Sequence, residues 1–204
     1  MNDAKRHKMP FSYGGEFMNL EEMKKKVFAL IEEYDKNSPY LTADVDLQAK
    51  VNEVINQVMF ELARLKKIPK YVEIAVDIGQ LLEFADIESE CGYEIYQLGT
   101  VGGVRYVPKA NGTVLKILES GTAEIECYVY PERITEKTKD KAYEFELSPD
   151  VLEIMPYGVA ADLLKSDVSA EYGNVYAQRY MELKQMLDPR YQHTTIYIEG
   201  GYDV

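Results

Sequence analysis

The spacing of hydrophobic residues changes twice along the chain and divides it into three parts. Apolar residues recur with a helical period over 18–69, alternate with polar ones from Tyr71 to about Leu147, and return to a helical period over 148–187. A helical period predicts an amphipathic helix, whereas alternation predicts a half-buried strand. The pattern therefore predicts an α+β fold, mostly a helical bundle, with two helices before and two helices after a small inserted antiparallel β-domain at 70–147.

The first predicted helix begins at a sequence typical of a helix N-terminus. Asn19 can cap the backbone, and Glu22 three residues later completes a capping box. The apolar positions that follow, from Leu20 to Tyr34, keep a helical period. The polar loop at 35–39 is expected to end this helix.

The second predicted helix has the most regular apolar stripe in the sequence. Thr42 or Asp44 is the expected cap, and Pro69 follows the last turn. A buried aliphatic side chain stabilises a fold by about 1.5–3 kcal/mol, so a stripe of this length requires a packing partner. The stripe consists of Leu47, Val51, Val54, Ile55, Val58, Leu62 and Leu65.

The central part shows the alternation and the turn signals of short antiparallel strands. Every second residue from Val72 to Ile78 is apolar, which predicts the first strand. An Asn-Gly turn at 111–112 and a Ser-Gly turn at 120–121 are predicted to join the last three strands into a meander. The remaining predicted strands are 93–101, 104–107, 113–118 and 123–130.

Two further helices are predicted between residues 148 and 187. Ser148 followed by Pro149 is typical of a helix start, and Pro156 is expected to kink or restart that helix. The tyrosines of the last helix are explained either by ordinary packing or by a face between subunits, and Tyr176 and Tyr180 are its candidate interface residues. The apolar series of this helix is Tyr172, Tyr176, Tyr180, Leu183 and Leu187.

The two ends of the chain lie outside the periodic parts. Residues 1–17 are polar and without period, which predicts a disordered leader, or sequence upstream of a start at Met18. Residues 188–204 are predicted to form an extended C-terminal arm with a reach of roughly 55 Å. Within it, Thr194–Glu199 has strong strand propensity and is expected to pair with its own β-domain or with a neighbouring subunit. The candidate arm contacts are Ile196, Tyr197 and Ile198.

Composition and charge exclude several classes of function. A net charge of -12 disfavours binding to nucleic acid or to an anionic membrane, because both need clustered Lys and Arg. No apolar run reaches the roughly 20 residues that span a bilayer. The polar N-terminus does not resemble a secretory signal. We therefore expect a cytoplasmic protein that binds no membrane.

Residues that support catalysis are scarce. The two histidines, His7 and His193, lie in the terminal segments, which disfavours a Ser-His-Asp or Cys-His site. Cys91 and Cys127 lack a CxxC partner and are expected to be reduced thiols, with a disulfide or a reactive thiol as alternatives. The glycine pairs form no phosphate-binding loop. We expect no catalytic residue, no cofactor and no metal site.

Three segments carry a resemblance to a known family. They are Lys50–Arg64 in the second predicted helix, Leu152–Leu164 with its Pro-Tyr pair and spaced Ala and Leu, and the Tyr-rich Tyr176–Lys184 after a short polar break. In this order they resemble the head–tail connector (adaptor) proteins of tailed bacteriophages. The resemblance covers about residues 18–204 and rests on architecture, not on chemical motifs.

The resemblance implies a structural role without catalysis. It implies a helical bundle that docks on the portal protein of a phage or prophage, in a homo-oligomeric ring that commonly has twelve-fold symmetry and contacts tail or neck proteins. The isolated subunit can be monomeric, and the arm would embrace a neighbouring or portal subunit. Such a protein is assembled in the host cytoplasm and resides in the virion. DNA would pass the acidic ring without specific binding.

Two other functions stay open from the sequence. The 17 tyrosines, with no tryptophan, suit a protein interface, but they also suit a small-molecule or glycan-binding module with an aromatic groove on the β-domain. Another virion morphogenesis factor, such as a tail completion protein, fits the same architecture. The tyrosines of the predicted groove are Tyr93, Tyr96, Tyr106, Tyr128 and Tyr130.

Overall fold

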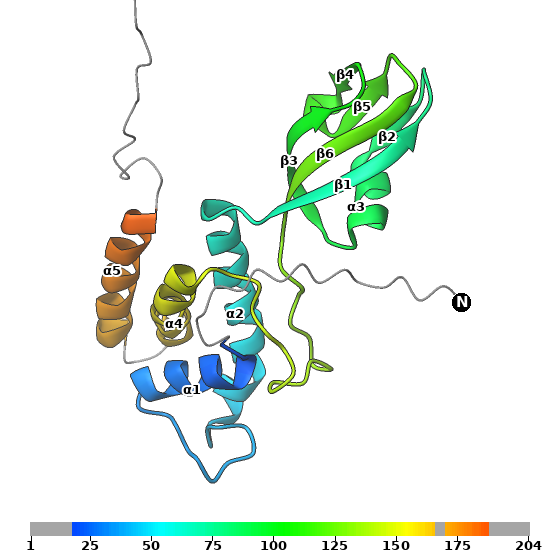
Figure 1. Cartoon of the computed structure of the whole chain (residues 1–204). Coiled ribbons are helices and arrows are strands. Elements are labelled where there is room, and N and C mark those ends of the chain that lie inside the picture. Colours follow the sequence, from blue (N-terminus) through cyan, green and yellow to red (C-terminus); the bar gives the residue numbers. More distant parts are fainter. Residues whose placement is uncertain (1–17, 166–169, 188–204) are drawn as a thin grey trace, which may run out of the picture.

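The computed structural model describes residues 18–165 and 170–187, which form two unlike parts (Figure 1). Helices make up one part, and a β-domain with one helix of its own makes up the other. The described residues contain five α-helices and two small antiparallel sheets, which confirms the predicted α+β class. The predicted leader at 1–17 and arm at 188–204 lie outside these ranges.

The caps of the first two helices are as predicted. Asn19 and Glu22 form the capping box of α1 (Leu20–Leu30), with the Glu22 N–H donating to Asn19 Oδ1 at 2.9 Å. Asp44 caps α2 (Val45–Leu65) by accepting from the backbone N–H groups of the first turn. These bonds satisfy donors that a helix start otherwise leaves without partners.

Helix α1 ends before the apolar pattern of the sequence does. The chain leaves the helix after Leu30, and Glu32 adopts a left-handed conformation with φ of 62°. An L-residue in this region cannot continue a right-handed helix. The expected extension of the helix to Tyr34 is therefore wrong, and Tyr34 is an exposed side chain of the following loop.

Helix α4 (Pro149–Leu164) lies at the centre of the helical part, between α5 (Ala170–Leu187) and α2 (Figure 1). It contacts α1, α2 and α5, and nearly all of its apolar residues are buried. Pro156 lies inside α4, which continues through it as one helix, so the helix does not restart there.

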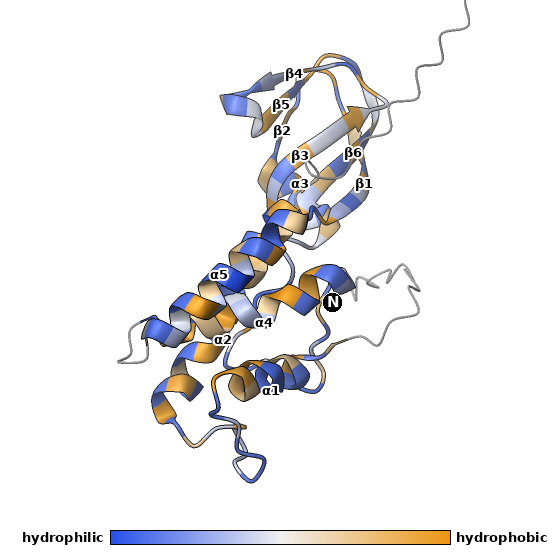
Figure 2. Cartoon of the chain, turned by 90° about the vertical axis from the view of Figure 1, so that its left-hand side faces the viewer, coloured by the Kyte–Doolittle hydropathy of each residue, from blue (hydrophilic) through white to orange (hydrophobic). Residues whose placement is uncertain are grey.

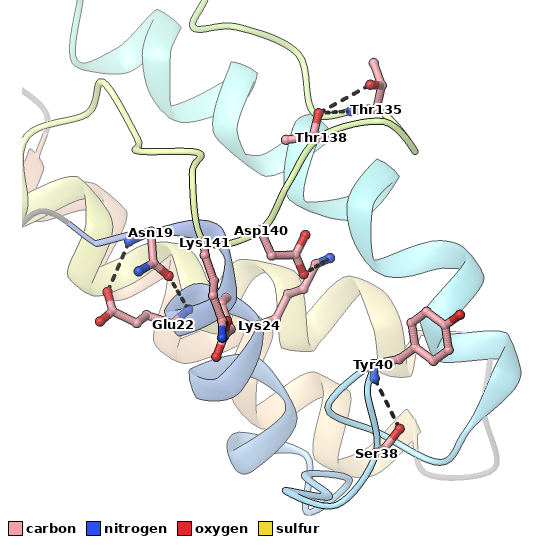
Figure 3. A network of polar contacts seen from close by, with 10 residues as sticks. Asn19, Glu22, Lys24, Ser38, Tyr40, Thr135, Thr138, Asp140 and Lys141 are labelled. Carbon is pink, nitrogen blue, oxygen red and sulfur yellow. Dashed lines mark hydrogen bonds and ion pairs between the residues drawn. The ribbon is translucent and has the colours of Figure 1, made fainter.

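The segment 130–147 returns from the β-domain and packs on the helices. The buried Asn56 amide on α2 donates to the Ile134 carbonyl and accepts from the Ile134 N–H, both at 2.8 Å. Lys24 on α1 pairs with Asp140 of this segment at 2.8 Å (Figure 3). The buried side chains of segment 130–147 belong to the core cluster of the helices. Those side chains are Tyr130, Ile134, Tyr143, Phe145 and Leu147.

The strands form two three-stranded antiparallel sheets with the orders β1-β6-β3 and β2-β5-β4. The expected meander is wrong, because β6 does not pair with β5 but crosses to the other sheet. In that sheet β6 pairs with all eight residues of β1, whereas β5 is only four residues long. The strands are β1 (Pro69–Val76), β2 (Leu81–Glu83), β3 (Ile95–Gly102), β4 (Tyr106–Lys109), β5 (Val114–Ile117) and β6 (Gly121–Val129).

A short helix inside the β-domain was not predicted. It is α3 (Phe84–Cys91), it buries only Ile87, and it ends at Gly92 with φ of 73°. A helix this short with one buried residue leaves no apolar period in the sequence. Its N-terminal signal is a capping box between Glu83 and Asp86, in place of the more common Ser, Thr or Asn cap.

Candidate interaction surfaces

Helix α5 is covered by the rest of the chain on one side only. Gly173, Tyr180 and Leu187 form its buried side, at intervals close to two helical turns. The Tyr180 ring lies against Gly158 of α4, where an added Cβ would be only 2.9 Å from Tyr180 Cε2. The glycine therefore lets the ring approach the α4 backbone closely.

The two predicted interface tyrosines both make contacts within the subunit. Tyr180 is 9% exposed, and its hydroxyl donates to Glu61 Oε2 at 3.0 Å. Burial, followed by the Glu61 charge, raises the pKa of Tyr180. The Tyr176 hydroxyl donates to the Leu30 carbonyl at the end of α1. Ordinary packing of α5 therefore accounts for both tyrosines, and the predicted arm contacts Ile196, Tyr197 and Ile198 lie outside the described residues.

The outer side of α5 carries a stripe of exposed apolar residues. Tyr172, Val175 and Met186, called the α5 stripe below, are 70%, 63% and 69% exposed. Their spacing is close to whole helical turns, so they share one side of the helix. Arg179 and Glu182 lie between them and form an ion pair at 3.5 Å. In Figure 2, α5 faces the viewer, and hydrophobic and hydrophilic residues alternate along its ribbon.

Tyr172 lies on a different side of α5 from Tyr180, although the sequence pattern places both in one series. Tyr172 was grouped with Tyr176 and Tyr180 because the three are four residues apart. Four residues exceed one turn of about 3.6 residues, so such a series drifts around the helix. Tyr172 falls at the margin of the apolar face, and there the structure exposes it. Val175 and Met186 were not singled out, although the same spacing rule connects them to Tyr172.

The five tyrosines of the predicted groove do not line one groove. The Tyr96 and Tyr130 rings pack at a tilt with centroids 4.9 Å apart, and the Tyr130 ring also packs on that of Phe60 of α2 at 4.9 Å. The Tyr96 hydroxyl donates to the Ala63 carbonyl at 2.9 Å, and burial raises the pKa of Tyr96 to about 12. These contacts fix the β-domain to the end of α2, so the two rings act in packing.

The other groove tyrosines lie beside lysines or at a shallow cavity. The Lys67 ammonium is 4.3 Å from the Tyr128 ring centroid, and the Lys70 ammonium is 4.2 Å from that of Tyr93. Tyr106 borders an open cavity of about 330 Å³ between β3 and the β4–β5 hairpin. Its apolar lining includes Phe84, Tyr96, Leu98, Val101, Tyr106 and Leu115.

The cysteines form a local pair of free thiols inside the β-domain. Cys127 is buried on β6, and Cys91 is half-buried at the end of α3. The Cys127 thiol donates to the Lys70 carbonyl and the Cys91 thiol to the Tyr93 carbonyl. The interaction between the two thiols lowers the pKa of Cys91 to about 7 and raises the pKa of Cys127. The pairing makes Cys91 the more nucleophilic of the two thiols.

No metal site is formed by the residues of 18–165 and 170–187. Within these ranges no cluster of three His, Cys, Asp or Glu side chains can hold an ion. Both histidines lie outside them. None of the described helices is long and apolar enough to cross a membrane.

Comparison with models of known families gives no match, and none of the curated proteins compared is significantly similar to the chain.

Proposed function

We propose that this chain is a structural, non-catalytic subunit of a phage or prophage head–tail connector ring. In this role it docks on the portal protein and bridges the capsid to tail or neck proteins during virion assembly. The observation that carries the proposal is the α5 stripe, because three large apolar side chains are exposed on the helix that leads into residues 188–204. Scattered surface apolar residues are common, whereas an aligned set on one helix suits a protein interface.

The proposed architecture is a helical bundle with an inserted β-domain and an extended arm. Its support is the shared core of α1, α2, α4 and α5, in which α4 is surrounded by the other helices. In a ring, the outer side of α5 would pack on the neighbouring or portal subunit. The segment 188–204 would continue from this interface, with Ile196, Tyr197 and Ile198 as contacts of the arm.

The acidity of the chain suits a channel for DNA. A net charge of -12 on each subunit would be multiplied around the ring. A negative wall neutralises no phosphate, so DNA would pass without binding. The electrostatic potential of an assembled ring tests this, and a basic inner surface would contradict it.

The geometry gives less support to a small-molecule or glycan-binding module. Tyr96 and Tyr130 fix the β-domain to α2, and only Tyr96 and Tyr106 of the five tyrosines line the open cavity of about 330 Å³. A ligand site is usually a concave pocket that encloses most of its ligand, with a few placed polar groups among apolar ones, whereas this cavity is open.

The proposal is tested by mixing the protein with the portal protein encoded in the same genome. We expect a complex of ring size in sedimentation velocity for the natural sequence. The pair Tyr172→Ser with Val175→Ser should abolish this complex, because it removes two members of the α5 stripe. The matched control is Asn174→Ser with Gln178→Ser, which changes two exposed polar residues of the same helix.

The outcomes separate the proposed functions. Absence of any complex with the portal protein, at concentrations well above those in an infected cell, would exclude the connector role. A chain that ends at Leu187 should fail to form the ring while its β-domain stays folded. Binding of a glycan or metabolite by that shortened chain would instead favour the binding module.

A further inference from the structure

The sheet β1-β6-β3 has two edges that differ in regularity. The β1·β6 pairing runs without interruption from Pro69 opposite Tyr128 to Val76 opposite Gly121. The β3·β6 pairing has two register shifts, between Ile95 and Gln97 and between Leu98 and Val101. Irregularities of this kind protect an edge against further pairing, and a long regular edge lacks that protection.

The pattern of hydrogen bonds between β1 and β6 shows which backbone groups of β1 are left free at its outer edge. The Val129 N–H donates to the Ile68 carbonyl at 3.2 Å, whereas the next N–H, of Tyr130, donates to Glu94 on the β3 side at 2.9 Å. Residues in an antiparallel strand alternate between facing the partner and facing away. The even-numbered residues of β1 therefore bond to β6, and the N–H and C=O groups of Tyr71, Glu73 and Ala75 point outward.

These outward groups have no hydrogen-bond partner among the described residues. The backbone of Pro69, the first residue of β1, also faces outward, but proline has no N–H group that could stay unpaired. The side chains of Tyr71, Glu73 and Ala75 are exposed, whereas Val72 and Ile74 lie half-buried against the β-domain core. A strand added beside β1 would pair the three free peptide groups and cover the remaining apolar surface.

We propose that the β1 edge receives Thr194–Glu199 of a second copy of this chain as an added strand. The segment alternates in the way this edge requires. Thr194, Ile196 and Ile198 share one side, where two isoleucines can lie beside Val72 and Ile74. Thr195, Tyr197 and Glu199 share the other, solvent-facing side, together with Tyr71 and Glu73.

The choice of a second copy rests on the proposed function. Met186 of the α5 stripe lies next to Leu187, where the described chain ends. If the α5 stripe packs on a neighbour, residue 188 starts at that interface. Residues 188–193 can then span roughly 20 Å before the strand begins, which is enough to reach an edge on the adjoining subunit.

The edge is tested with a labelled peptide that has the sequence of residues 188–204. Fluorescence anisotropy measures its binding to the full chain, to Glu73→Pro and to the matched control Glu73→Gln. Proline removes one outward N–H and leaves the β6 ladder intact, so we expect binding at least tenfold weaker. Glu73→Gln keeps the N–H and should bind within about twofold of the natural chain. Equal binding by the two variants would overturn the proposal.

A second measurement does not depend on the folding of a variant. Two peptides are compared, one N-methylated at Ile196 and one at Tyr197. The N–H groups of consecutive strand residues point in opposite directions, so only one methyl group can meet β1. One peptide should lose binding and the other keep it. Equal loss or equal retention would show that the segment does not bind as a strand.

The occupant is tested by mixing two full-length variants. One carries Glu73→Pro and an intact terminal segment, and the other carries an intact edge with Ile196→Lys and Ile198→Lys. Exchange between copies predicts that neither variant self-associates and that the mixture forms a dimer. A mixture that stays monomeric while the peptide still binds the edge would place the segment on its own subunit and overturn the exchange.

Failure of this inference can be told from failure of the connector role. If Glu73→Pro forms the ring with the portal protein as the natural sequence does, the strand exchange is wrong and the connector role stands. If the peptide binds the edge and no portal complex forms, the exchange stands and the connector role is wrong.

Discussion

Helices α4 and α5 are neighbours, yet the rest of the chain surrounds one and covers only one side of the other. Ten of the sixteen residues of α4 are buried, on most sides of the helix, and it contacts α1, α2 and α5. Of the α5 residues whose burial the structure describes, only Gly173, Tyr180 and Leu187 are buried. A helix that is apolar all round needs partners on every side, and α4 has them within the chain.

Because α4 and α5 differ in burial, substitutions on the two helices should affect different properties of the protein. Substitutions of the buried residues of α4 should act on folding, because these residues are part of the helical core. Substitutions on the outer side of α5 should leave folding unchanged and act only on association with other chains.

Met155→Ala should have the largest effect on stability. Met155 on α4 is 0% exposed, and truncating a buried methionine to alanine costs about 2–5 kcal/mol through lost burial and a residual cavity. Urea unfolding followed by circular dichroism measures the change. Met181→Ala on α5 is the matched control, since Met181 is 57% exposed and its loss should cost under about 0.5 kcal/mol. Similar losses for the two variants would contradict the comparison.

The sequence predicted both helices, but not the contrast between their environments. The existence of both helices and the cap of α1 followed from local spacing and residue type. The side of α5 that stays exposed depends on which helix packs against it, and that contact is not encoded in a period. The pairing of β6 with β1 across the domain could not be predicted for the same reason, because a turn at 120–121 does not specify a sheet.

Gly158→Ala tests how closely the two helices approach. The added methyl group would lie 2.9 Å from Tyr180 Cε2 and 3.0 Å from Val58 Cγ1. Overpacking of this kind costs about 1–3 kcal/mol, against which alanine recovers about 0.5–1 kcal/mol of helix preference. We expect a net loss of about 1 kcal/mol in urea unfolding. The control Gly158→Ala in a Tyr180→Leu background should lose less, because the clash is largely with the ring.

Tyr180→Phe should reduce the loss of stability at high pH. Burial raises the pKa of Tyr180 above its ordinary value of 10.0, so folding favours the protonated phenol. Its contribution is complete below pH 10 and declines as the pH rises further, because the unfolded chain then binds fewer protons. The phenylalanine variant lacks this contribution. Its free energy of unfolding should therefore fall less steeply between pH 9 and pH 11 in chemical denaturation.

Other buried tyrosines also contribute to the loss of stability at high pH. Burial also raises the pKa of Tyr96, to about 12, and that of Tyr143. The alkaline decline of the Tyr180→Phe variant should therefore be smaller than that of the natural chain but not absent. An unchanged decline would mean that the Tyr180 hydroxyl is not buried against Glu61 in solution.

The smallest expected effect on stability belongs to Met186→Ala, in the α5 stripe. Met186 is 69% exposed and Met181 is 57% exposed, and both lie on α5, so either truncation should change the free energy of unfolding by less than about 0.5 kcal/mol. The two residues lie on different sides of α5, because only Met186 aligns with Tyr172 and Val175. If the α5 stripe is an interface, Met186→Ala should weaken the portal complex by about tenfold while Met181→Ala leaves it intact, since a buried interface methionine contributes over about 1 kcal/mol. Equal effects of the two substitutions on sedimentation would show that the outer side of α5 has no preferred stripe, and the comparison with α4 would then concern folding alone.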